Sequence, residues 1–263
     1  MVRKGTIEGK GFTMDYFCFG KGERPFVLLP GVSPDPITPI AELVAKQYSR
    51  FHDDFTTYVF DRKRDFEDGY TIEQMVDDTA EAMRSLGIKD ACVMGTSQGG
   101  MMALVLAAKY PELVSKLVPC CTTSCAEDVT ISTINDWAEL AKAGEVEALF
   151  NSFYRNVFSE AFQQKNANAI KAAIKLGTPE GLERVRKLVN ACLGFDARPL
   201  LGNIKCDCLV VGSRIDNVLG LQPALNIAKA LNCPTVIYDE YGHAAFDEAY
   251  ADLHEHLIQF FNA

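Results

Sequence analysis

The chain has 263 residues, of which 48% are hydrophobic, and its formal net charge is −9 at pH 7. This size and apolar content predict one sizeable domain with room for an insertion, and the negative charge disfavours a nucleic-acid partner, because phosphate binding requires clustered Lys and Arg. The nine cysteines are an odd number without metal-ligand spacing, and the N-terminal residues lack the pattern of a signal peptide, so we expect reduced buried thiols, no metal ion, no membrane span and a cytoplasmic protein.

Strand-like and helical patterns alternate along the chain from Phe26 onward. This alternation is typical of an α/β fold, in which a mostly parallel sheet of about eight strands has helices on both faces. We expect strands at Thr13–Phe19, Phe26–Leu29, Thr57–Phe60, Ala91–Met94, Leu117–Cys121, Cys208–Val211 and Thr235–Tyr238. We expect helices at Ile40–Tyr48, Ile72–Leu86, Gly99–Lys109, Pro223–Leu231 and Asp247–Phe261.

The segment Gly95-Thr96-Ser97-Gln98-Gly99 follows one of these strands and opens a helix that Pro111 ends. It predicts a sharp turn with Ser97 at its apex, where the hydroxyl is presented to a substrate. The flanking glycines are needed because any side chain there would collide with the strand or the helix. The backbone N–H of Gln98, at the helix N-terminus, is then free to stabilise an oxyanion. The alternative is that Ser97 is an ordinary helix N-cap after a tight turn.

The alternation is interrupted between about Ala126 and Ala197, where helical patterns replace strands. The expected helices are Thr133–Ala143, Val146–Tyr154, Ala161–Lys175 and Pro179–Cys192. Large apolar side chains recur in this segment, and such a stripe forms either a helix core or a pocket wall. The candidates for a pocket wall are Leu149, Phe150, Phe153, Tyr154, Phe158 and Phe162. A pocket lined by them, with Phe150, Phe153, Tyr154 and Phe158 as the expected substrate contacts, would favour uncharged acyl or aryl groups.

A serine nucleophile needs a base, and the base needs an orienting carboxylate. Asp216 lies in a loop after the expected strand Cys208–Val211, and His243 lies in a loop after Thr235–Tyr238. The order Ser97, Asp216, His243 is the order found in enzymes with the G-x-S-x-G motif. A turn aspartate and a surface-loop histidine are the simpler interpretations. Glu127 and Asp128 are the alternative acids.

The remaining histidines and the main basic group are expected to be structural. His52 lies in a charged turn, and we expect His254 and His256 on the solvated face of the C-terminal helix. The run Arg62-Lys63-Arg64 is short and flanked by acidic residues, so we expect a solvated loop.

With these motifs the chain resembles the α/β-hydrolase superfamily over nearly its whole length. Asp61-Arg62-Lys63-Arg64, Tyr70–Asp78 and Tyr110–Val118 resemble further family segments. The resemblance implies an α/β-hydrolase fold with Ser97 as nucleophile, His243 as base and Asp216 as orienting acid, without a cofactor. It also implies a core formed by residues 1–125 and 198–263, with residues 126–197 inserted as a helical cap.

The chain departs from the family pattern at two places. The family often has His-Gly after its third strand, whereas Leu28-Leu29-Pro30-Gly31-Val32 has proline at the histidine position. Gly31 still permits the turn, and the N–H of Val32 matches the second oxyanion donor. The spacing from Gly212 to Asp216 is one residue longer than the commonest family pattern.

The leading hypothesis is a serine hydrolase that cleaves a carboxylic ester of a small uncharged or apolar substrate through an acyl-enzyme on Ser97. The same triad also serves thioester hydrolysis, acyl transfer, perhydrolysis and carbon–carbon bond hydrolysis on this scaffold, because a fold and a triad do not fix the substrate. A ligand-binding or receptor-like homologue is the alternative outside enzymes. The expected partner is a small molecule, with no nucleic acid and no membrane.

Overall fold

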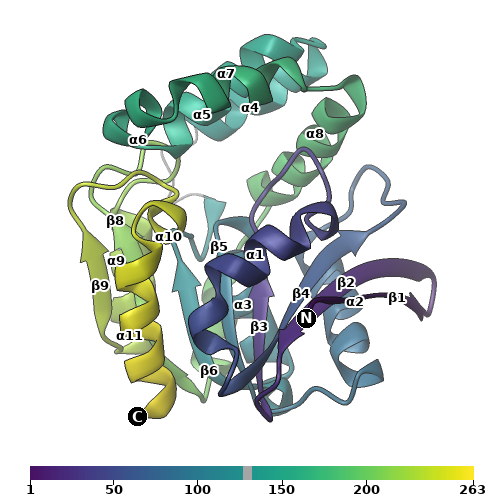
Figure 1. Cartoon of the computed structure of the whole chain (residues 1–263), viewed down its shortest axis with the longest axis vertical. Helices are drawn as coiled ribbons and strands as arrows, with labels where there is room; N and C mark the ends of the chain where they lie inside the picture. The colour runs from purple at the N-terminus through teal and green to yellow at the C-terminus, as the bar shows by residue number, and fades with distance from the viewer. Residues whose placement is uncertain (127–131) are drawn as a thin grey trace.

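The computed structural model describes residues 1–126 and 132–263, and these residues form one sheet flanked by helices (Figure 1). The strand order in the sheet is β1-β2-β4-β3-β5-β6-β8-β9, with the short β7 also paired to β6. The strands are β1 (Arg3–Gly9), β2 (Phe12–Gly20), β3 (Arg24–Leu29), β4 (Phe55–Lys63), β5 (Ala91–Thr96), β6 (Val114–Cys120), β7 (Asp207–Cys208), β8 (Val210–Ser213) and β9 (Thr235–Tyr238).

Pairing is antiparallel between β1, β2 and β4 and parallel from β4 to β9. The prediction of a mostly parallel sheet with flanking helices is therefore confirmed. The edge strand β1 was not expected, because most of its residues are exposed and only Ile7 is buried. A strand that pairs on one side only and faces solvent carries no continuous apolar run for the sequence to reveal.

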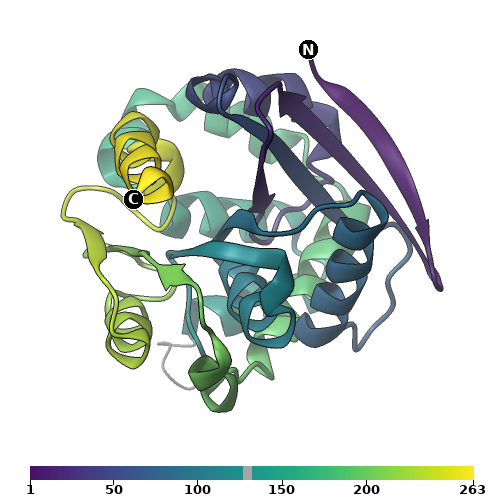
Figure 2. The same ribbon diagram turned by 90° about the horizontal axis from the view of Figure 1, so that it is seen from below.

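Helices cover both faces of the sheet, as the view along it shows (Figure 2). The first face packs against α1 (Ala41–Gln47) and α11 (Tyr250–Asn262). The second packs against α2 (Ile72–Ser85), α3 (Gln98–Lys109) and α9 (Gln222–Leu231). Every residue of α3 except Lys109 is buried, which explains the nearly continuous apolar pattern after the G-x-S-x-G segment.

A layer of helices lies beyond the carboxyl ends of the parallel strands, at the top of Figure 1. It consists of α4 (Ser132–Lys142), α5 (Val146–Val157), α6 (Glu160–Lys165), α7 (Ala167–Lys175) and α8 (Pro179–Leu193). Its apolar side chains, among them Trp137 and Phe150, form one cluster with Val218, Leu219 and Ala244 from the loops after β8 and β9. The helical layer therefore packs directly on two loops at the carboxyl end of the sheet.

Three expectations about helices are wrong. The helix expected at Asp247–Phe261 is interrupted at Ala249, so that α10 (Ala245–Glu248) precedes α11 (Tyr250–Asn262). The helix expected at Ala161–Lys175 is two helices, because Asn166 has a non-helical backbone and its side-chain amide donates to the carbonyl of Phe162. His254 is fully buried on α11, against the rings of Tyr48 and Phe51, and not on a solvated face. Within the described residues, no helix is long and apolar enough to cross a membrane.

Candidate active site

Ser97 lies at the junction between β5, which ends at Thr96, and α3, which begins at Gln98. Its backbone has φ 53° and ψ −120°, a conformation that costs a non-glycine residue energy. A Cβ placed on Gly95 would lie 2.1 Å from the carbonyl oxygen of Gly99. A Cβ on Gly99 would lie 1.9 Å from the carbonyl oxygen of Leu29. The turn therefore requires glycine at both positions, as the motif predicts.

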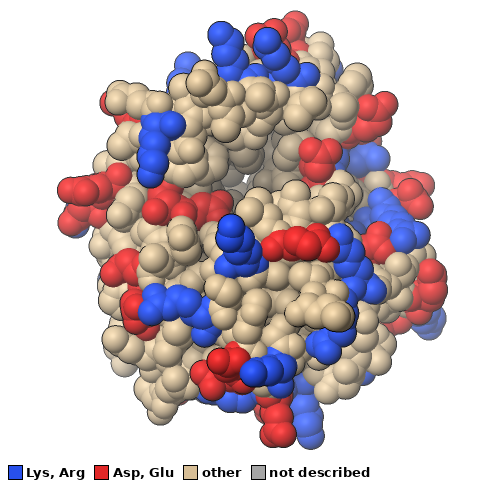
Figure 3. Space-filling model, in the orientation of Figure 1, with Lys and Arg blue, Asp and Glu red and all other residues tan. Residues whose placement is uncertain are grey.

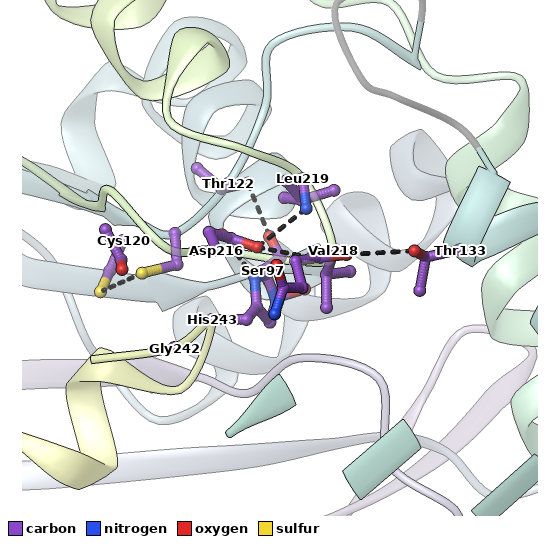
Figure 4. A network of polar contacts seen from close by, with 12 residues as sticks. Ser97, Cys120, Thr122, Thr133, Asp216, Val218, Leu219, Gly242 and His243 are labelled. Atoms are coloured by element: carbon purple, nitrogen blue, oxygen red, sulfur yellow. Dashed lines mark hydrogen bonds and ion pairs between the residues drawn. The ribbon is translucent and has the colours of Figure 1, made fainter. Parts of the chain in front are cut away.

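Asp216 and His243 form a buried pair beside this turn (Figure 4). His243 Nδ1 lies 2.8 Å from Asp216 Oδ2, and Asp216 Oδ1 accepts the N–H groups of Val218 and Leu219, each at 2.8 Å. The two backbone donors fix the position of the carboxylate, and its contact with Nδ1 favours the tautomer in which Nδ1 carries the proton. The other ring nitrogen, Nε2, is then free to accept a proton.

The Ser97 hydroxyl and the His243 ring line the same cavity. Among the described residues, no hydrogen bond joins the two side chains. Catalytic hydrogen bonds are often loose without substrate and tighten when it binds. The alternative acids Glu127 and Asp128 lie outside the described residues, and Asp216 is the carboxylate that meets His243.

Glu248 fixes the loop that carries His243. One carboxylate oxygen accepts the N–H of Gly242 at 3.0 Å and the N–H of Ser159 at 2.9 Å. The other accepts the Ser159 hydroxyl. The N–H of Ala244 also donates to the carbonyl of Val157, at 2.9 Å. These bonds attach the histidine loop to the junction of α5 and α6.

The two expected oxyanion donors lie on either side of Ser97. Gln98 is the first residue of α3, where helix geometry leaves the N–H without an intrahelical partner. Val32 lines the cavity, and Gly31 is so close that its Cβ would lie 3.1 Å from the Cβ of Ser97. The main chain after β3 and the turn after β5 are therefore in contact beside Ser97.

The interpretation of Arg62 as part of a solvated loop is wrong. Arg62 lies within β4, is 4% exposed and donates from Nη2 to the Pro30 carbonyl at 2.8 Å and to Gln98 Oε1 at 3.0 Å. Burial lowers the pKa of its guanidinium to about 10, so it remains charged at neutral pH. This cation supports the loop in which proline replaces the family's histidine.

The cavity has a volume of about 480 Å³ and mostly apolar walls. Of the four aromatic residues expected to contact substrate, Phe153 and Phe158 line it. Phe150 is buried within the helical layer. Tyr154 is outside the lining and stacks on Phe158, with ring centroids 6.0 Å apart. The hollow is visible below the helical layer in Figure 3, with acidic side chains on either side of it.

Much of this wall was not expected from the sequence. Trp137 of α4 and Val189 of α8 face the cavity from the helical layer, and Ile40 and Leu43 form its opposite edge. Ile40 is 50% exposed and Leu43 is 62% exposed, which is unusual for large apolar side chains. The sequence marks them only as residues of an amphipathic helix.

The charged groups in the described lining are Asp35, Asp247 and the titratable His243, with no Lys or Arg. Gln47 Nε2 donates to Asp247 at 3.0 Å. Such a cavity disfavours an anionic substrate, because its described lining carries two carboxylates and no Lys or Arg. Within the described part of the chain, no group of three or more His, Cys, Asp or Glu side chains is arranged to hold a metal ion.

Comparison with known proteins agrees with this fold. A family model described as alpha/beta hydrolase fold matches residues 29–250. The chain is 25% identical over 206 residues to a putative carbamate hydrolase RutD of Rhizobium rhizogenes, covering 75% of this chain and 79% of that protein. It is 31% identical over 123 residues to the mouse serine hydrolase BPHL, covering 44% of this chain and 42% of that protein. The enol-lactonase structure from Burkholderia xenovorans LB400 superposes with a TM-score of 0.86 and 19% identity, covering 98% of this chain and 100% of that chain.

Proposed function

The chain belongs to the alpha/beta hydrolase family, and from this premise we propose that it is a serine hydrolase that cleaves a carboxylic ester of a small, uncharged, apolar substrate. The observation that carries the proposal is the buried Asp216–His243 pair, whose imidazole lines the same cavity as the strained Ser97. This combination supplies a nucleophile, a base and an orienting acid.

In the proposed mechanism, His243 Nε2 removes the proton from Ser97 as the hydroxyl oxygen attacks the ester carbonyl. The N–H groups of Gln98 and Val32 stabilise the tetrahedral oxyanion. His243 then returns the proton to the leaving alcohol, and the acyl group remains on Ser97. A water molecule, deprotonated by His243, releases the acid in the second half of the cycle. Asp216 stays ionised throughout and stabilises the imidazolium.

The cavity supports an apolar, uncharged substrate. Its apolar walls gain from burying an acyl chain, and Asp35 and Asp247 repel a substrate carboxylate. We also propose that residues 126–197 act as a cap whose movement admits substrate and releases product. A reducing, cytoplasmic location is supported by the free thiols of Cys18, Cys92, Cys120, Cys121, Cys192, Cys206, Cys208 and Cys233.

A carbamate is the second candidate substrate, because a chain with 25% identity over most of its length carries that name. Its carbonyl reacts with the same nucleophile, base and oxyanion donors. The two candidates differ in the acylated enzyme, since a carbamoyl group on serine is less electrophilic than an acyl group and is hydrolysed more slowly.

The test is turnover of p-nitrophenyl esters from acetyl to octanoyl, beside p-nitrophenyl N-alkyl carbamates of matched length. We expect ester turnover that depends on chain length and falls by about 10⁴-fold or more in Ser97→Ala. Multiple turnovers of the carbamates with little ester turnover would favour the second candidate. Equal rates for Ser97→Ala and the wild-type protein would contradict both.

A further inference from the structure

Gln98 has two roles that use different parts of the residue. Its backbone N–H is the proposed oxyanion donor. Its side-chain amide is fully buried, accepts from Arg62 Nη2 at 3.0 Å, and donates from Nε2 to the carbonyl of Leu188 at 2.6 Å. Leu188 lies in the middle of α8, so one residue connects the reaction centre to a helix of the cap.

Arg62 extends this connection to the other oxyanion donor. The same Nη2 group that meets Gln98 also donates to the carbonyl of Pro30 at 2.8 Å, two residues before Val32. The connection therefore runs from α8 through Gln98 and Arg62 to the loop after β3. Gln98 itself carries one proposed donor. Arg62 binds the Pro30 carbonyl, two residues before Val32, which carries the other.

The α8 helix also forms part of the substrate cavity. Val189 and Cys192, next to and one turn after Leu188, line the cavity wall. Earlier in the helix, a Cβ on Gly181 would lie 3.3 Å from Pro34 in the loop after β3. A substrate that presses against this wall therefore contacts the helix that holds the Gln98 side chain.

A purely structural role does not account for a charge at position 62. Arg62 Nε has no hydrogen-bond partner among the described residues, and the Asp61 carboxylate is occupied by the N–H groups of Ile37 and Thr38. Burying an incompletely paired cation is costly. The Arg62 guanidinium is better explained by the two groups that it holds in place, the Pro30 carbonyl and the Gln98 side chain.

We propose that Gln98 and Arg62 are positioning residues that keep the two oxyanion donors aligned and couple their alignment to the position of α8. An acyl chain that fills the cavity presses against α8 and thereby brings the two oxyanion donors into alignment. The length of the acyl chain therefore changes kcat as well as KM. This inference rests on the proposed ester hydrolysis.

The test uses Gln98→Met and Arg62→Met, which keep the backbone donors and approximate the side-chain volumes, with Met102→Leu as a matched control in α3. We expect kcat on p-nitrophenyl octanoate to fall about 10- to 100-fold in Gln98→Met and Arg62→Met. The reason is that displacing an oxyanion donor can lower kcat by as much as deleting that donor. We expect KM to change less than about twofold, and the octanoyl-to-acetyl ratio of kcat to move toward one. Arg62→Lys, which can reach one of the two acceptors, should recover part of the loss.

Thermal unfolding separates positioning from folding. Each Met variant leaves buried polar partners unpaired, so its melting temperature should fall, and kcat is therefore compared well below that temperature, where every variant is folded. The inference is overturned if kcat is unchanged, if the loss is in KM alone, if the octanoyl-to-acetyl ratio stays at its wild-type value, or if Met102→Leu loses as much kcat. It is also overturned if the loss follows the melting temperature. Wild-type turnover of the esters tests the proposed function separately, because it does not depend on any of the variants.

Discussion

The buried His254 predicts a specific dependence of stability on pH. Its ring is fully buried, with centroids 4.6 Å from Tyr48 and 5.0 Å from Phe51. Neither ring nitrogen has a hydrogen-bond partner among the described residues. Burial, with a smaller contribution from the positive charge of Arg50, lowers the pKa of His254 to about 4. The folded protein therefore keeps this imidazole neutral at pH values where the unfolded chain protonates it.

The size of the effect on the free energy of unfolding follows from the shift in the pKa of His254. Moving the pKa of His254 from 6.5 to about 4 corresponds to roughly 3 kcal/mol, at about 1.4 kcal/mol per pH unit. Because the folded-state pKa is lowered, the contribution is fully present above the unfolded pKa. It is lost as the pH falls from about 6.5 toward about 4.

The assay is urea unfolding from about pH 7.5 to about pH 4.5, with His254→Leu beside the wild-type protein. Carboxylates titrate in the lower part of this range too, and the difference between the two proteins removes their contribution. We expect the wild-type protein to lose about 2–3 kcal/mol more than the variant over this range. Equal losses would mean that His254 titrates normally in the folded state, and would refute the reasoning.

Three further predictions concern the site. Asp216→Asn should lower kcat on p-nitrophenyl esters by about 10⁴-fold with a small effect on KM, since the histidine loses its tautomer and its counter-charge. Gly99→Ala should lower the melting temperature by about 5 °C or more in a circular dichroism scan, because the added Cβ meets a backbone carbonyl oxygen 1.9 Å away. An ester ending in a carboxylate should show a kcat/KM at least about tenfold below that of its neutral analogue. The double variant Asp35→Asn/Asp247→Asn should reduce this difference in kcat/KM.

The features that could be predicted from the sequence are those with local causes. The alternation of strands and helices follows from runs of buried residues, and the sharp turn at Ser97 follows from glycines that no other residue can replace. Asp216 and His243 could be paired because the carboxyl ends of parallel strands meet at one edge of a sheet. The edge strand β1 and the break at Asn166 have no comparable local signal.

The features that could not be predicted depend on distant segments. Arg62 looks solvated beside its charged neighbours, and only the packing of β4 between β2 and β3 turns it inward. The cavity wall combines Leu43, Trp137 and Phe246 from three separate parts of the chain. His254 did carry a signal, because it shares a helical face with Leu257 and Phe261, three and seven residues later.

The most direct test of the central claim is to locate the nucleophile. The purified protein would be treated with a fluorophosphonate, digested and analysed by mass spectrometry, with Ser97→Ala and Asp216→Asn in parallel. The proposed mechanism predicts one phosphonate adduct, on Ser97, with much slower labelling in Asp216→Asn and none at this position in Ser97→Ala. An adduct on another residue, or no adduct from folded protein, would contradict it.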